Sequence, residues 1–477
     1  QYYAMPLLDA LADALQVSPS ALFCDSLEIE TRELWDERLW ARFLDRFGYD
    51  LEPFVSDLDG LPEVRHDARA LIGDVILEEF YQEFARLCRD RGAFARVQCH
   101  GAPTDLLAAY AAVDVPESEC LLFPPTFSRI AASAAALEGR PIVSCETFTC
   151  LHGFLPAADS VVSWKREHVA DLKLLADAVI AEGVNQIVWH GTPFNPADGF
   201  ISFYASVHVG PDSRLVPHLR EFNSYLETVC DLMRIGRTES RLAVYFPMED
   251  ARMLDKIPRA DRVPGSLHHW EMRHAVAPRE SRGFAPLWIS LPFLDRGEVI
   301  DRRLVVGEQV FEALLVDVEW LELRSLERIA RLVESGLVVI LARRPRQPGV
   351  RKSPDFARIL DDIEGRPSVA RSLQATGLRP IVEGEAIPPF WARTTEDRLI
   401  LFFAHPDVEA IRYPLPYPSR LGGREARRRI VIQAFGESSA IELIFSPYQA
   451  VVIVKDLGAP ARLVDAAFHP PTPPMVG

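Results

Sequence analysis

The chain has 477 residues, of which 48% are hydrophobic and 25% charged, so it can bury large apolar cores without disulfides or metal ions. Its formal net charge of −16 makes nucleic acid an unsuitable partner, because phosphate binding needs a concentrated basic surface. No apolar run approaches the roughly 18 residues that a membrane-spanning helix requires, so we expect no membrane partner.

Short apolar runs alternate with longer amphipathic stretches from residue 1 to about residue 240. The runs at 21–25, 94–99, 141–145 and 186–189 predict strands, and the stretches at 33–47, 66–91, 127–138 and 168–182 predict helices. Gly92, Gly139 and Gly183 each follow a predicted helix, as C-terminal caps do. This repetition of strand and helix predicts a parallel sheet with helical crossovers.

The predicted strands end in polar side chains, namely Asp25 with Glu28, His100, Glu146 and His190. In an α/β barrel, the carboxyl ends of the strands carry the chemistry. Four strand–helix units make about half of an eight-stranded barrel, and the first dozen residues have the pattern of a helix interior. We therefore expect residues 1–240 to form the second half of a (β/α)8 catalytic barrel whose first half is missing from this chain.

Two further regions follow the predicted half-barrel. Apolar runs at 242–247, 313–316 and 337–341, with a predicted helix at 323–334, indicate that residues 241–387 form a small doubly wound α/β domain of the flavodoxin or amidotransferase type. This region has no GxGxxG or GxxxxGK[ST] pattern, so we expect no nucleotide site in it. Residues 388–477 contain shorter strands separated by turn residues, which predicts a C-terminal β-sandwich.

Two glutamates are candidates for hydrolysis of a glycosidic bond, which needs one carboxylic acid and one carboxylate. Glu28 follows a strand beside Asp25 and could act as the acid, although the same residues would also suit the capped start of a helix. Glu146 lies among small polar residues at a strand end, with Phe148 nearby to pack on a sugar ring. An ordinary strand-end glutamate would have the same pattern.

A third acidic segment, residues 114–119, has three carboxylates around a proline and is interpreted as a loop. Glu117 and Glu119 could there supply oxygen ligands to Ca²⁺, although acidic loops without a metal are common. His100 and His190 could form hydrogen bonds with sugar hydroxyls, and each would equally suit a structural role.

The order of these segments resembles the α-L-rhamnosidases of glycoside hydrolase family 106. The matching stretches are residues 25–28 (DSLE), 47–51 (FGYDL), 114–117 (DVPE), 132–135 (ASAA), 144–149 (SCETFT), 183–191 (GVNQIVWHG) and 244–247 (VYFP). Leu27 departs from the family pattern, which has a larger aromatic residue there, so we expect a different pocket wall.

The resemblance implies a calcium-dependent, inverting hydrolase that removes terminal α-L-rhamnosyl residues from an oligosaccharide or a simple rhamnoside. Glu28 would take the place of the general acid and Glu146 that of the general base. Glu117 and Glu119 would lie among the Ca²⁺ ligands or their neighbours. The sugar would be bound by Asp25, His100, Phe148, Trp189 and His190.

Two alternatives stay open on the sequence. A retaining glycosidase of another sugar specificity would use Glu146 as a nucleophile, with carboxyl groups ~5–5.5 Å apart instead of ~6.5–9.5 Å. A non-catalytic carbohydrate-binding protein with a degenerate barrel would place Glu28 and Glu146 in separate, packed surroundings.

Overall fold

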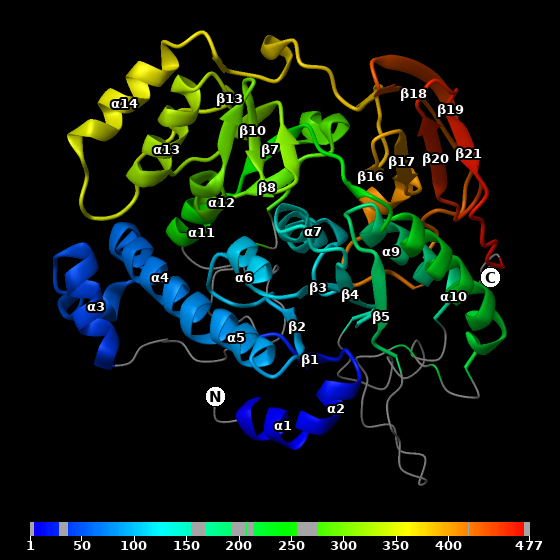
Figure 1. The fold of residues 1–477 in the computed structure, drawn as a ribbon, viewed down its shortest axis with the longest axis horizontal. Coiled ribbons are helices and arrows are strands. Elements are labelled where there is room, and N and C mark those ends of the chain that lie inside the picture. The colour runs from blue at the N-terminus through cyan, green and yellow to red at the C-terminus, as the bar shows by residue number, and fades with distance from the viewer. Residues whose placement is uncertain are drawn as a thin grey trace.

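The computed structural model describes residues 4–27, 37–149, 151–153, 167–191, 207, 209, 213–254, 272, 275–417 and 419–471. Three regions with different sheets are seen in Figure 1: an N-terminal region in blue to green, a parallel-sheet region in green to yellow, and antiparallel strands in orange to red. One continuous apolar core joins the first two regions, so they pack as neighbours.

The first region is built on a parallel sheet whose strands follow chain order. They are β1 (Ala21–Cys24), β2 (Phe94–Gln98), β3 (Val115–Cys120), β4 (Ser144–Thr147) and β5 (Gln186–Trp189). This is a curled sheet of the kind found in glycosidase barrels. The predicted strands at 21–25, 94–99 and 186–189 match β1, β2 and β5 closely, and the strand predicted at 141–145 begins at Ser144.

Helices precede, connect and follow these strands. They are α1 (Ala4–Ala10), α2 (Ala12–Val17), α3 (Glu37–Phe47), α4 (Pro62–Ile76), α5 (Glu83–Arg89), α6 (Leu106–Ala112), α7 (Ser128–Leu137), α9 (Val169–Ile180) and α10 (Val216–Leu232), with 3-10 turns at Glu52–Asp57 and Pro125–Phe127. The single helix predicted at 66–91 is α4 and α5 joined without a break by the π-helical segment Leu77–Gln82.

The acidic segment interpreted as a loop is a central strand, so that expectation was wrong. Residues Val115–Cys120 form β3, which pairs with β2 on one side and β4 on the other. A proline cannot donate a ladder hydrogen bond, but Pro116 lies before the point where β4 begins to pair, at Glu117. The carboxylates are tolerated inside the sheet because neighbouring strands supply donors to them.

The second region contains a parallel sheet in the order β14-β13-β12-β7-β8. Its strands are β7 (Leu242–Tyr245), β8 (Leu287–Ile289), β12 (Ala313–Val316), β13 (Val338–Leu341) and β14 (Val369–Ala370). Its helices are α11 (Met248–Met253), α12 (Leu291–Arg296), α13 (Leu323–Glu334) and α14 (Pro354–Glu364), with 3-10 turns at Arg279–Phe284 and Gln374–Thr376. A small antiparallel sheet adds β9 (Glu298–Ile300), β10 (Arg303–Val306) and β11 (Gln309–Phe311).

The C-terminal region has two antiparallel sheets that enclose a second apolar core. One contains β21 (Arg462–Val464), β20 (Val451–Asp456), β17 (Arg398–Phe403), β16 (Phe390–Thr394) and β6 (Arg237–Thr238). The other contains β15 (Val382–Glu383), β18 (Ala426–Ala434) and β19 (Glu437–Phe445); a 3-10 turn spans Pro406–Ala410. Strands β6 and β15 lie outside the expected range 388–477, so this region recruits chain that precedes it.

Polar contacts tie the regions together. Arg129 of α7 places Nε 2.6 Å from Glu182 Oε2 and donates through Nη1 to the Pro286 carbonyl before β8. Arg65 and Arg69 of α4 donate to the carbonyls of Met253 and Leu254 at the end of α11. Among the described residues, we find no helix long and apolar enough to cross a membrane.

Candidate active site

The two faces of the sheet β1–β5 differ in chemistry. Side chains alternate along a strand, and residues paired in register share a face. On the outer face, Ala95, Val97 and Cys145 are fully buried, and Ser118 Oγ lies 2.9 Å from Ser128 Oγ of α7. The inner face is polar instead. Register places Gln98, Glu117 and Ser144 in one row and Glu119 and Glu146 in the next.

Glu146 lies on β4 near its carboxyl end, with its side chain 18% exposed. Gln98 Nε2 donates to Glu146 Oε2 at 2.8 Å, and Thr149 Oγ1 donates to Oε1 at 2.7 Å. His190 Nδ1 lies 3.6 Å from the same Oε1. Each carboxylate oxygen is therefore oriented by a donor, while the group as a whole stays accessible. This arrangement suits a carboxylate that must receive a proton from water or attack a bound molecule.

Glu117 is completely buried and saturated with partners. Arg96 Nε lies 2.8 Å from Oε2, Ser144 Oγ donates to Oε2 at 2.7 Å, and Gln98 Nε2 lies 3.1 Å from Oε1. Burial raises the pKa of Glu117, against the opposing effects of Ser144 and Arg96. Because both oxygens already accept hydrogen bonds, Glu117 does not fit the expected role of a Ca²⁺ ligand.

Glu119 and His100 form a close pair beside Glu146. His100 Nε2 lies 2.8 Å from Glu119 Oε2, and both side chains are almost completely buried. Burial lowers the pKa of His100, but the charge of Glu119 and its hydrogen bond, with smaller contributions from Glu146 and Asp25, raise it above its ordinary value overall. The charges of Asp25, Glu119 and Glu146 thus all act on His100.

The two aromatic candidates pack together at the edge of this site. The ring centroids of Phe148 and Trp189 are 4.7 Å apart, and both contact Phe222 of α10. Phe148 is fully buried and has a positive φ of 80°, a backbone conformation that departs from β4 directly after Thr147. The structure thus brings the two rings to each other and to α10. Their contact with a sugar stays a prediction.

Glu28 lies outside the described residues, so its distance from Glu146, which would distinguish an inverting from a retaining site, stays untested. The described residues contain no group of three or more His, Cys, Asp or Glu side chains arranged to hold a metal ion. Sequence reasoning missed Gln98, Thr149 and Arg96, which hold the carboxylates. Gln98 precedes His100 by two residues, so strand alternation could have placed it on the same face.

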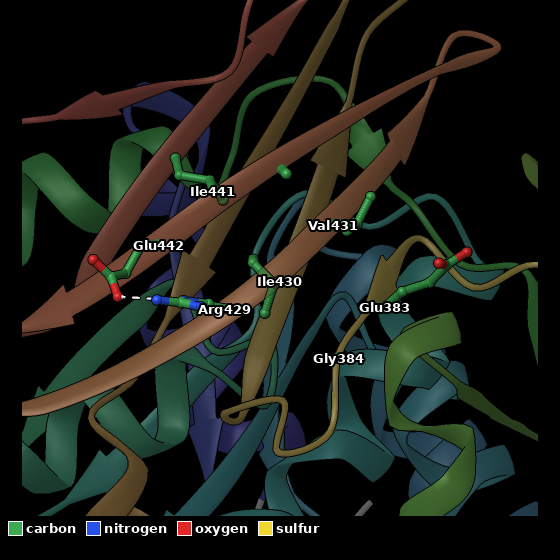
Figure 2. Close-up of a pocket in the computed structure, with 8 residues that line it drawn as sticks. Glu383, Gly384, Arg429, Ile430, Val431, Ile441 and Glu442 are labelled. Carbon is green, nitrogen blue, oxygen red and sulfur yellow. Dashed lines mark ion pairs between the residues drawn. The ribbon is translucent and has the colours of Figure 1, made fainter.

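The groove in Figure 2 is separate from these carboxylates. It is lined by Glu383, Gly384, Arg429, Ile430, Val431, Ala440, Ile441 and Glu442, from β15, β18, β19 and the turn after β15. Arg429 Nε lies 3.7 Å from Glu442 Oε1, its register partner on the adjacent strand. None of these residues comes from β1–β5, so the groove does not belong to the candidate active site.

The family description for α-L-rhamnosidases of glycoside hydrolase family 106 matches residues 2–387, most of the chain. The chain belongs to this family. The match covers all five strands of the sheet β1–β5 and the following parallel-sheet region, and it confirms the resemblance found in the sequence.

Comparisons with individual proteins agree on the class of fold. A rhamnosidase from Novosphingobium sp. PP1Y superposes with a TM-score of 0.70 at 16% identity, covering 97% of this chain and 48% of that one. A β-galactosidase from Bacillus circulans sp. alkalophilus superposes with a TM-score of 0.55 at 12% identity, covering 95% and 82%. A protein of Formosa agariphila named "Putative beta-glucuronidase" is 23% identical over 359 residues, 72% of this chain and 28% of its own length. The chain thus spans less than half of the rhamnosidase and of the curated relative.

Proposed function

We propose that this chain contributes to a glycosidase that removes terminal α-L-rhamnosyl residues with inversion at the anomeric carbon. The observation that carries the proposal is Glu146. It is a partly exposed carboxylate at the carboxyl end of β4, held by two donors, on a chain that belongs to a rhamnosidase family. We further propose that β1–β5 are the C-terminal half of a (β/α)8 barrel, followed by a doubly wound domain and a β-sandwich.

In this proposal, Glu146 Oε2 or Oε1 takes a proton from a water molecule as the water oxygen bonds to the anomeric carbon. The bond between that carbon and the glycosidic oxygen breaks, and the leaving oxygen receives a proton from Glu28. The sugar and one alcohol are the products, so atoms and charge balance. His100, paired with Glu119, donates to sugar hydroxyls beside Asp25, and His190 lies next to the attacking water.

The test is hydrolysis of an aryl α-L-rhamnoside by the full-length protein, followed by proton NMR of the first sugar anomer released. Inversion gives β-L-rhamnose first. Release of the α anomer first would replace the water-activating role of Glu146 by that of a nucleophile. A parallel panel should include aryl β-glucuronides and β-galactosides, because the relatives carry these names. Turnover of one of these but not of the rhamnoside would contradict the proposed specificity for rhamnose and leave the proposed role of Glu146 standing.

Calcium dependence is a separate proposal, which rests on the family resemblance. Glu117 does not fit it, and Glu119 is paired with His100, so any Ca²⁺ ion would need ligands beyond these two. Activity should fall when the protein is treated with a chelator and return when Ca²⁺ is added. Activity that is unchanged after exhaustive chelation contradicts this part without affecting the role of Glu146.

A further inference from the structure

Gln98 occupies an unusual place between two carboxylates. Its side chain is buried on the inner face of β2, and the single atom Nε2 lies 3.1 Å from Glu117 Oε1 and 2.8 Å from Glu146 Oε2. An amide nitrogen carries two hydrogens, so one can be directed to each carboxylate. Gln98 thus bridges Glu117 and Glu146.

Only one orientation of this amide is chemically acceptable. With the nitrogen toward the carboxylates, both contacts are hydrogen bonds to anionic acceptors, which are stronger than those between neutral groups. If the amide turned over, its carbonyl oxygen would face two carboxylates and repel both. The two acceptors therefore fix Gln98, and Gln98 in return fixes Glu146 Oε2.

The far end of this chain of contacts is anchored firmly. Glu117 is held by Arg96 Nε and Ser144 Oγ on its other oxygen, so it cannot follow Gln98 if the amide moves. The Arg96 guanidinium lies 4.5 Å from the ring centroid of Phe23 on β1, a stacking contact that orients it. One set of contacts thus crosses the sheet from β1 to β4 and ends at Glu146.

We propose that Gln98 is a positioning residue for Glu146, with its amide held by Glu117, which Arg96 in turn anchors. The inference rests on the proposed role of Glu146 as the carboxylate that acts on water or sugar. Thr149 orients Oε1 and Gln98 orients Oε2, so together they set the plane of the carboxylate. A carboxylate fixed in this way presents a constant direction for proton transfer, which is worth much of the rate of such a step.

The test compares two substitutions of Gln98 with the same two at Gln186. Gln186 is a matched control because it begins β5 on the same face, paired with Ser144 and not with Glu146. In Gln98→Leu, Glu146 loses a donor, so kcat should fall about 10²-fold with little change in KM. The acidic limb of the pH–rate profile should also move to higher pH, because a donor to the charged form is lost. In Gln98→Glu this limb should move further, and neither Gln186 variant should move it.

A second readout does not require activity. Gln98→Glu adds a third carboxylate between Glu117 and Glu146, so folding should favour its protonated form. The melting temperature of the Gln98→Glu variant should be clearly below that of the wild type at pH 8. The difference should shrink toward pH 5 as the new carboxylate takes up a proton. Gln186→Glu should show a small difference at both values of pH.

The outcomes separate this inference from the proposed function. If the protein cleaves a glycoside but Gln98→Leu keeps the wild-type pH profile and kcat within about threefold, Gln98 has no positioning role and the function stands. If Gln98→Leu fails to fold, the pH profile of Gln98→Glu decides in its place. If no glycoside is cleaved, the proposed function fails, and a melting difference for Gln98→Glu that is independent of pH would overturn the inference as well.

Discussion

Glu146 is the residue on which the proposed chemistry depends, and glutamine is the substitution that changes its shape least. In Glu146→Gln the amide keeps the shape and can still accept from Thr149, but it cannot take a proton. We expect kcat to fall roughly 10²- to 10⁴-fold, the usual contribution of a general base, with an unchanged circular dichroism spectrum. Glu442→Gln, in the groove of Figure 2, is the control and should keep full activity. Activity of Glu146→Gln close to that of the wild type would remove Glu146 from the mechanism.

At the scale of the residue, the sequence singled out Glu146 more readily than the side chains that contact it. Glu146 and His100 could be found because each follows an apolar run at a predicted strand end. Gln98 and Thr149 carry no comparable signal, because a neutral polar residue near a strand end has many structural explanations. Their roles depend on which strand lies beside which, and that is decided by pairing between segments far apart in the chain.

Among the elements, β3 shows why a buried strand can escape sequence reasoning. Strand patterns are recognised by apolar side chains, whereas the inward-facing positions of β3 are Glu117 and Glu119. Their burial is made possible by Arg96 on the neighbouring strand β2 and by His100, two residues after the end of that strand. The helices were predicted more closely, since α7 and α9 have long apolar faces and end before Gly139 and Gly183. Thus local signals place the helices, while the polar strand depends on its neighbours.

The contact between β2 and β3 gives a prediction about stability. Arg96→Met removes the cation that faces the buried carboxylate of Glu117, leaving a buried charge without its partner. We expect this change to lower the stability by about 3 kcal/mol, the usual cost of breaking a buried pair from one side. The double variant Arg96→Met with Glu117→Gln should lose less, because no uncompensated charge is left. Urea denaturation of the wild type, both single variants and the double variant measures the coupling, and additive losses would contradict it.

On the scale of the whole molecule, the junction between the first two regions carries a buried acid. Glu249 of α11 is fully enclosed after β7, with Tyr245 Oη 2.8 Å from Oε1. The pKa of Glu249 is raised to about 7, mainly by burial and secondly by the negative charge of Glu322, while Arg252 opposes the shift. His66 of α4 lies 3.6 Å from Glu322 Oε1, so a helix of the first region faces this cluster directly.

The sign of the resulting pH dependence follows from linkage. An unfolded glutamate has a pKa of about 4.3, so between pH 4.3 and about 7 the folded chain holds a proton that the unfolded chain has released. Stability from this group is therefore complete below pH 4.3 and is lost as the pH rises through about 7.

Glu249→Gln keeps the shape and the hydrogen bond from Tyr245 and removes the charge. It should match the wild type near pH 4.5 and melt at a higher temperature at pH 8, by an amount equivalent to at most about 4 kcal/mol. Melting curves at pH 4.5, 6 and 8, with the exposed Glu298→Gln as a control, measure this difference. If Glu249→Gln gains nothing at pH 8, the junction holds Glu249 in a more hydrated or better paired state than its enclosure implies.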